Sequence, residues 1–343
     1  MDLELLHERA RIIRRARSFF DERNYLELDT PLLAPDLIPE SCLEVFETSR
    51  ILPSGAAAHY WLIPSPEIWM KKIIAQHRTS VYQICKCFRN GESSGFLHSP
   101  EFTMLEYYTM DANYLDSLKI TEDLFAFLSE VGSGEWGVGS GVAVRKHSEL
   151  PIRSDCEQRS LLPFIQMTVA EAFDRFAGVD LFAAAETEGA LETEARRLGL
   201  DPPAGMGTAQ LYDLIFIHAV EPRLKQERPV ALLDYPAFVP CLARKTAGGK
   251  TVERWELYYN GIELANCFTE ETDAEQVRNF FESEATAKER HALVRHRVDR
   301  DYWKIFEGTP PLPPCSGVAL GLDRLIMALC GRSSIDGVLP FPM

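Results

Sequence analysis

Hydrophobic and polar positions recur along the chain with two periods, which predict amphipathic helices and short β-strands. Near the N-terminus, Ala10, Ile13 and Phe20 fall on one helical face, opposite a row of arginines. Further along, residues 80–88 and 101–110 alternate as strands do, and a loop with glycines, serines and a proline separates them. We expect an antiparallel hairpin here. Arg89 at the end of the first strand, with hydrogen-bond acceptors on the second strand, favours a site for a phosphate and a purine. Ordinary surface charge would give the same local pattern.

A second hairpin is predicted between residues 255 and 270. Its turn falls at Asn260-Gly261, a dipeptide that favours two-residue hairpin loops. The turn brings Glu256 and Glu263 to one face, where two carboxylates repel each other unless a cation or ligand lies between them. The pair therefore suggests Mg²⁺ and a triphosphate. Three residues alternate along one side of the second strand: Asn266, Phe268 and Glu270.

Two junctions between a strand and a helix place charges at helix N-termini. In Ser65-Pro66-Glu67, the glutamate either compensates the helix dipole or presents its carboxylate to a substrate ammonium. At the second junction, Gly321 allows close approach of a ligand, and Arg324 lies in the first turn of the following helix. A cation at a helix N-terminus is unfavourable unless an anion binds there, so phosphate is the candidate ligand.

Composition narrows the class of protein. The chain has 343 residues, of which 46% are hydrophobic, enough for a large globular core. Its formal charge of -15 argues against a large nucleic-acid footprint. The N-terminus is acidic and then amphipathic, which favours the cytoplasm over secretion, and no run is long enough to span a membrane. The eight cysteines lack metal-ligand spacing and are expected to be reduced thiols.

Three segments of the chain together resemble the three signature motifs of class II aminoacyl-tRNA synthetases: residues 17–31, 88–108 and 317–331. The runs PSPE, HSPEFTMLEYY and GIELANCF are most similar to the lysine-specific enzymes. The resemblance implies an α+β fold with a central antiparallel β-sheet flanked by helices. It implies one catalytic domain over residues 1–343, with a possible insertion around residues 132–165. It also implies ATP and Mg²⁺ as cofactors, and a homodimer formed through the first motif.

The lysine-specific synthetases carry an N-terminal OB-fold domain for the anticodon, whereas this chain enters the first motif almost at once. We therefore expect no anticodon-binding domain and no tRNA partner. The chain is most similar to free-standing relatives that activate (R)-β-lysine with ATP and transfer it to a lysine of elongation factor P. Ala319, where the synthetases generally have glycine, would reshape the pocket for a β-amino acid. The alternatives are a truncated synthetase that activates α-lysine for tRNA or another acceptor, and an inactive binding module of the same fold.

The resemblance assigns roles to the residues at matching positions. Arg89 and Arg324 would be catalytic, on the α- and γ-phosphates, and Glu256 and Glu263 would hold Mg²⁺. Phe102 would stack on adenine. The positions implied for ATP are Arg89, Asn90, Gly91, Glu92, Ser99, Phe102, Glu256, Leu257, Gly321 and Arg324.

The lysine substrate would lie against a second group of residues. Ser65 and Glu67 would take its inner amine, while Glu106, Tyr108, Asn266 and Glu270 would surround the ε-ammonium. The positions implied for the substrate are Ser65, Pro66, Glu67, Glu106, Tyr108, Glu263, Asn266, Glu270 and Ala319. Cys267 replaces a glycine that the family usually has, and is expected to narrow the floor of this pocket.

Overall fold

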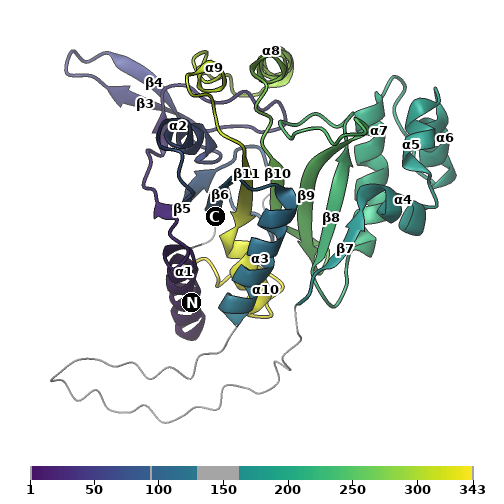
Figure 1. Cartoon of the computed structure of the whole chain (residues 1–343), viewed down its shortest axis with the longest axis horizontal. Helices are drawn as coiled ribbons and strands as arrows, with labels where there is room; N and C mark the ends of the chain where they lie inside the picture. Colours follow the sequence, from purple (N-terminus) through teal and green to yellow (C-terminus); the bar gives the residue numbers. More distant parts are fainter. Residues whose placement is uncertain (1, 93–94, 130–161, 342–343) are drawn as a thin grey trace, which may run out of the picture.

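The computed structural model describes residues 2–92, 95–129 and 162–341 (Figure 1). Its centre is an eight-stranded β-sheet in the order β1-β5-β6-β11-β10-β9-β8-β7. The strands of this sheet, in that order, are Leu26–Glu27, Val81–Phe88, Glu101–Met110, Cys315–Gly321, Ile262–Thr269, Thr251–Tyr259, Val230–Pro236 and Ile165–Thr168.

The sheet is antiparallel except at its two edges. β1 pairs with β5, and β7 with β8, in parallel. Parallel neighbours need a long crossover, and each of these pairs is separated in sequence by helices or by a smaller sheet. The expected α+β fold is therefore confirmed, and the parallel edges are the difference from a wholly antiparallel sheet.

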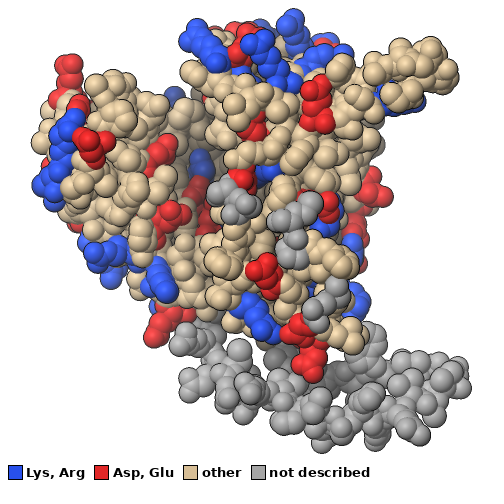
Figure 2. Space-filling model, turned by 180° about the vertical axis from the view of Figure 1, so that it is seen from behind, with Lys and Arg blue, Asp and Glu red and all other residues tan. Residues whose placement is uncertain are grey.

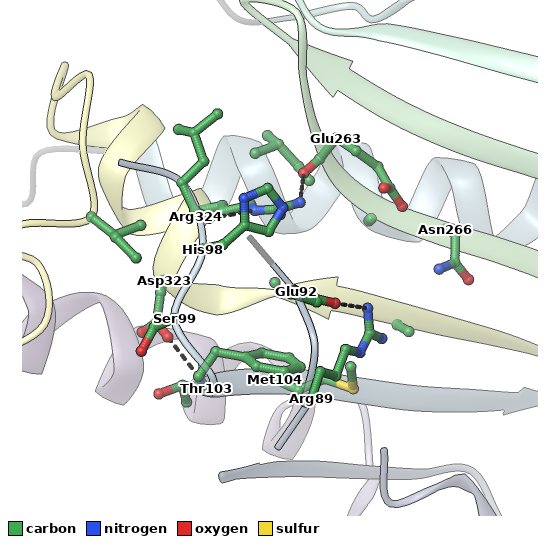
Figure 3. Close-up of a pocket in the computed structure, with 17 residues that line it drawn as sticks. Arg89, Glu92, His98, Ser99, Thr103, Met104, Glu263, Asn266, Asp323 and Arg324 are labelled. Carbon is green, nitrogen blue, oxygen red and sulfur yellow. Dashed lines mark hydrogen bonds and ion pairs between the residues drawn. The ribbon is translucent and has the colours of Figure 1, made fainter. Parts of the chain in front are cut away.

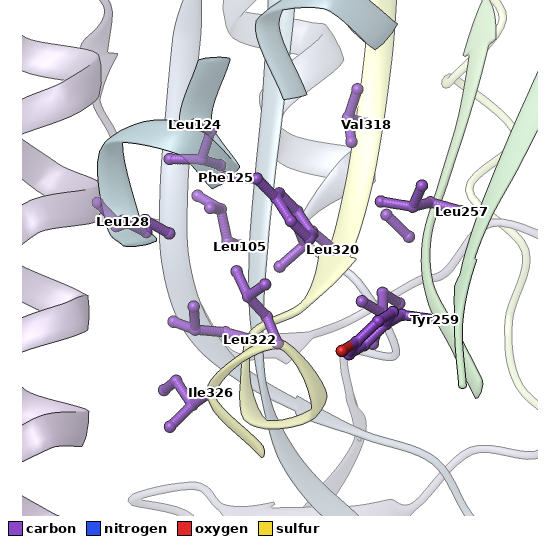
Figure 4. Packing of buried hydrophobic residues seen from close by; sticks show 14 of the residues in the cluster. Leu105, Leu124, Phe125, Leu128, Leu257, Tyr259, Val318, Leu320, Leu322 and Ile326 are labelled. Carbon is purple, nitrogen blue, oxygen red and sulfur yellow. The ribbon is translucent and has the colours of Figure 1, made fainter. Parts of the chain in front are cut away.

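One face of the central sheet is covered by three helices: α1 (Leu3–Asp21), α3 (Tyr114–Ser129) and α10 (Leu322–Leu329). Their apolar residues pack against alternate residues of β6, β11 and β9 (Figure 4). Leu105, Leu257, Val318 and Leu320 are sheet residues of this core. Because strand side chains alternate between faces, the residues next to these in sequence point to the opposite side of the sheet, where they can line a binding site.

The opposite face is covered by α2 (Glu67–His77), α8 (Ala274–His291) and α9 (Lys304–Glu307). Ile74, Phe281 and Phe306 from these helices join Tyr108 of the sheet in one hydrophobic cluster. A small sheet in the order β2-β4-β3 lies beside α2 (Figure 1); its strands are Leu33–Ala34, Ala57–Leu62 and Glu47–Ile51. The site described below lies on this face.

The remaining helices form a separate layer beside β7 and β8, at the right in Figure 1. They are α4 (Val169–Ala177), α5 (Leu181–Glu186), α6 (Ala190–Arg197) and α7 (Thr208–Ile215), which continues into a π-helical turn, Phe216–Val220. A capping box begins α4: Thr168 accepts from the Glu171 amide, and Glu171 accepts from the Thr168 amide.

The two predicted hairpins are confirmed as β5–β6 and β9–β10. Asn260 and Gly261 both have positive φ, as the predicted turn requires. Most of the expected insertion around residues 132–165 lies outside the described residues. Within the described part of the chain, none of the helices has the length and apolar composition of a bilayer span.

Candidate active site

A cavity opens on the α2 face of the sheet, between the β5–β6 hairpin, β10 and the junction of β11 with α10 (Figure 3). On the face shown in Figure 2, the surface is hollowed, and acidic and basic side chains lie inside the hollow. Among the residues expected from the sequence, those that line the cavity are Arg89, Glu92, Ser99, Phe102, Glu263, Asn266, Ala319, Gly321 and Arg324.

Strand pairing explains how residues distant in sequence meet here. Glu106 pairs with Ala319, Ala319 with Asn266, and Asn266 with Glu256. Directly paired residues share a face, so these four form one row across β6, β11, β10 and β9. A bulge between Glu263 and Ala265 shifts the register by one residue, and this returns Glu263 to the same face. The bulge was not foreseen from the sequence.

Arg89 lies at the end of β5 and faces the cavity. Its guanidinium carbon is 5.2 Å from the centroid of the Phe102 ring, and its Nη1 is 3.8 Å from Glu92 Oε1. Within the described residues, the buried Arg89 Nε–H meets no acceptor. A buried N–H needs an acceptor, and a guanidinium favours phosphate or carboxylate oxygens, so Arg89 is suited to bind an anion in the cavity.

Arg324 is held by backbone carbonyls. Its Nη1 donates to the carbonyl of Glu263 at 2.9 Å, and its Nε to the carbonyl of Leu97 at 3.2 Å. Neutral carbonyls orient the guanidinium without neutralising it, so its positive charge remains available to an anion in the cavity. The predicted position in the first turn of a helix is confirmed.

The two glutamates expected to bind Mg²⁺ have different surroundings. Glu263 lines the cavity, and burial together with the charge of Glu256 raises the pKa of Glu263 to about 7. Glu256 does not line the cavity; it accepts from Tyr235 and Tyr258, each at 2.6 Å, and pairs with Arg254. Mg²⁺ commonly uses one or two carboxylates plus substrate phosphates, and a divalent cation would relieve the repulsion that raises the Glu263 pKa. The pair therefore fits Mg²⁺, although no cluster of three ligand side chains occurs among the residues described.

A second, more deeply buried group of charges lies next to this row. The Nζ of Lys71 is 2.6 Å from Glu67 Oε1 and 2.7 Å from Glu270 Oε2. Tyr108 donates to Glu106 Oε1 at 2.8 Å. The buried polar atoms of this group that have no partner among the described residues include Glu106 Oε2, Glu270 Oε1 and the Tyr302 hydroxyl. Two open carboxylate oxygens in a buried site are the acceptors that an ammonium requires.

Burial governs the ionisation of these carboxylates. It raises the pKa of Glu270 to about 7, although Lys71 lowers it. It also raises the pKa of Glu106 well above the usual range, and the charge of Glu67 adds to this. A bound ammonium would stabilise both carboxylates in their ionised form.

Several expected site residues lie elsewhere. Leu257 packs in the hydrophobic core on the opposite face (Figure 4), so its side chain does not reach the cavity. Asn90 donates to the carbonyl of Val45 at 3.3 Å, and Gly91 lies beside Glu44 with a positive φ. Ser65 accepts weakly from the Glu67 amide at 3.4 Å, and Pro66 is the N-cap of α2.

The expectation for Cys267 is wrong. Its side chain is fully buried in the core on the far face of β10, 3.2 Å from Ser316 Oγ, because alternation places it opposite Asn266. It therefore does not form the floor of the pocket.

Among the site residues that were not predicted, five are polar or charged. Lys71 and Tyr302 lie in the buried charge cluster, and His98, Thr103 and Asp323 line the cavity. A signal existed for Lys71, which stands four residues after Glu67 on one helical face. No sequence pattern marks Tyr302, because the carboxylates and the lysine near it come from segments distant in the chain.

The fold, the two cavity arginines and the three motif segments define a class II aminoacyl-tRNA synthetase catalytic unit. In agreement, the family model described as tRNA synthetases class II (D, K and N) matches residues 3–343. The chain therefore belongs to this family, and it is an ATP-dependent amino-acid ligase.

Individual relatives narrow the comparison. The chain is 33% identical over 341 residues to an elongation factor P--(R)-beta-lysine ligase of Avibacterium paragallinarum, covering 99% of this chain and 95% of the relative. It is 31% identical to the enzyme of the same name from Mannheimia succiniciproducens, with the same coverage. It is 32% identical to that of Proteus mirabilis over 98% of this chain and 94% of the relative.

Proposed function

We propose that this chain activates (R)-β-lysine with ATP as the aminoacyl adenylate and transfers it to a lysine side chain of elongation factor P. The observation that carries the proposal is the pairing of two subsites on one sheet face. One holds Arg89 and Arg324 in a cavity, and the other holds buried carboxylate oxygens without partners. The relatives named above supply the identity of the amino acid and the acceptor.

In the first reaction, the carboxylate of lysine attacks the α-phosphorus of ATP in line and expels pyrophosphate. Arg89 lies where it can hold the α-phosphate, with Phe102 against the adenine, and Arg324 would hold the γ-phosphate. Glu256 and Glu263 would hold Mg²⁺, which neutralises phosphate charge when bound. No proton transfer is needed in this step, so positioning and charge neutralisation carry the rate enhancement.

In the second reaction, the neutral amine of the acceptor lysine attacks the carbonyl carbon of the adenylate. An amide bond forms, AMP leaves with the bonding electron pair, and the attacking nitrogen releases a proton. The buried charge cluster of Glu67, Lys71, Glu106 and Glu270 is called the amine subsite here. It would hold the two ammonium groups of the amino acid during both steps. Glu106, Asn266 and Glu270 would fill this role; Glu106 and Asn266 share one face of the sheet, and Glu270 directly follows β10.

Three further features belong to the proposal. A protein acceptor rather than tRNA fits the formal charge of -15, because phosphate contacts need clustered Lys and Arg. A homodimer through residues 17–31 follows the family pattern for the first motif. A cytoplasmic location fits an acceptor that takes part in translation.

Pyrophosphate exchange with (R)-β-lysine and α-lysine, followed by mass analysis of elongation factor P, tests the proposal. We expect exchange with (R)-β-lysine and a mass increase on the factor, both abolished in Arg89→Ala. A clear preference for α-lysine would favour a synthetase-like enzyme instead. Failure to bind ATP in calorimetry would favour an inactive module.

A further inference from the structure

The amine subsite already contains one ammonium group, supplied by the chain itself. Lys71 is fully buried on α2, and its Nζ lies between Glu67 and Glu270 at 2.6 and 2.7 Å. The same nitrogen is 5.4 Å from the centroid of the Phe268 ring and 5.8 Å from that of Tyr108. Burying a lysine without compensation is strongly unfavourable, so this arrangement depends on the two carboxylates.

The charges of the subsite can be counted. Glu67, Glu106 and Glu270 supply three carboxylates, and Lys71 supplies one ammonium. When a bound ammonium stabilises all three carboxylates in their ionised form, the cluster has two negative charges in excess, which equals the number of ammonium groups on a diamino acid. Two carboxylate oxygens, Glu106 Oε2 and Glu270 Oε1, are buried and have no partner among the described residues.

We propose that Lys71 is a positioning residue that sets the charge of the amine subsite, holding Glu67 and Glu270 in place for a substrate with two ammonium groups. This inference rests on the proposed function and deepens it, because it names what matches the subsite to a diamino acid. Lys71 itself does not contact the reacting carboxylate; it acts through the two glutamates.

The electrostatic environment supports this role. Lys71 lowers the pKa of Glu270 against the effect of burial, and it also opposes the rise in the pKa of Glu106. Without the lysine, both carboxylates would hold protons at higher pH, and a protonated carboxyl group cannot pair with an ammonium. The titratable and charged groups around Lys71 are Glu67 and Lys72 on α2, Glu106 and Tyr108 on β6, Glu270 after β10, Cys315 on β11 and Tyr302 before α9, with Glu40, Cys85 and Arg89 beyond them.

The helix provides a matched control in the next residue. Lys72 carries the same charge on the same helix, but it pairs with Asp299 outside the cluster and its side chain is 35% exposed. Lys71→Met and Lys72→Met therefore remove one ammonium each from adjacent positions, and only the first lies in the subsite.

The test measures pyrophosphate exchange with (R)-β-lysine between about pH 6 and pH 9. In Lys71→Met, we expect the acid limb of the pH profile of kcat/KM for lysine to move up by about one pH unit. At a fixed pH on that limb, kcat/KM should therefore fall roughly tenfold. The KM for ATP should not change. Lys71→Arg should keep the wild-type acid limb, and so should Lys72→Met.

The inference is overturned if Lys71→Met keeps the wild-type pH profile while only its thermal stability falls. It is also overturned if Lys72→Met shifts the profile equally. Should Lys71→Met fail to fold, Lys71→Arg decides: a shifted acid limb despite the retained charge refutes the role. If the wild-type enzyme exchanges with neither lysine, the proposed function fails, and this outcome is distinct from an active enzyme in which Lys71 has no effect.

Discussion

Arg9 on α1 connects the first helix to the phosphate end of the site. Its Nη1 lies 2.5 Å from Asp323 Oδ1, and its Nη2 donates to Thr103 Oγ1 at 2.8 Å. Asp323 in turn accepts from the Thr103 amide at 2.6 Å and immediately precedes Arg324. The side chains of Arg9 and Asp323 are only 12% and 5% exposed. This ion pair therefore ties α1, β6 and α10 together at the cavity.

We predict that Arg9→Met lowers the free energy of unfolding by about 3 to 5 kcal/mol, the usual cost of removing one partner from a buried ion pair. The carboxylate of Asp323 would remain buried with the Thr103 amide as its hydrogen-bond donor. Because Asp323 and Arg324 share the first turn of α10, the KM for ATP should also rise, while the KM for lysine should stay close to its wild-type value.

Arg11→Met is the matched control. Arg11 lies on the same helix and pairs with Glu8 at 2.7 Å, but these side chains are 35% and 46% exposed. An exposed pair contributes about 0 to 1 kcal/mol, so this variant should be nearly as stable as the wild type. Urea unfolding of both variants measures the difference. Equal losses of stability, or an unchanged KM for ATP in Arg9→Met, would refute the reasoning.

Three further predictions follow from single contacts. A Cβ on Gly317 would lie 2.4 Å from Tyr108 Cε1, so Gly317→Ala should displace that ring and raise the KM for lysine but not for ATP; exchange kinetics with an unchanged lysine KM would contradict this. Burial raises the pKa of Glu270 to about 7 from 4.5, so its contribution to stability is complete below about pH 4.5 and is lost as pH rises towards 7. Glu270→Gln has no carboxyl group to ionise at this position. In urea unfolding without substrate between about pH 4.5 and pH 7, the free energy of unfolding of the wild type should therefore fall by about 3 kcal/mol relative to that of the variant. A rise in the free energy of unfolding of the wild type over the same interval would exclude the assignment. Cys267→Gly should lower the free energy of unfolding by about 2 kcal/mol in urea unfolding and leave the KM for lysine unchanged. A lower KM for lysine would instead indicate that Cys267 lines the pocket.

Local patterns were sufficient for the elements that carry the site. The β5–β6 and β9–β10 hairpins, the Asn260-Gly261 turn and the start of α10 at Leu322 all agree with the sequence. Each depends on side-chain period or turn chemistry within a few residues, which is information that a single sequence contains. Arg89 and Arg324 were found for the same reason, since Arg89 directly follows a predictable strand and Arg324 lies in the first turn of a predictable helix.

Where a residue was assigned by resemblance and not by strand alternation, its side-chain direction was harder to obtain. Cys267 was expected at the pocket and lies in the core, and Leu257 also points into the core. The bulge between Glu263 and Ala265 changes which residues share a face, and no local pattern signalled it. A shift of one residue reverses the face of every later side chain, so a small backbone irregularity has a large effect on the site.

By itself, the sequence determined the elements, their turns and the residues with the chemistry for phosphate and ammonium binding, because these depend on neighbours along the chain. Tertiary structure alone decided the strand order that places β6, β11 and β10 side by side, and with it the row from Glu106 to Glu256. It also decided that Lys71, an ordinary helix residue by pattern, is buried between Glu67 and Glu270. Glu67 and Glu270 are about two hundred residues apart in sequence, and the charge of a buried site depends on every group that the fold brings to it.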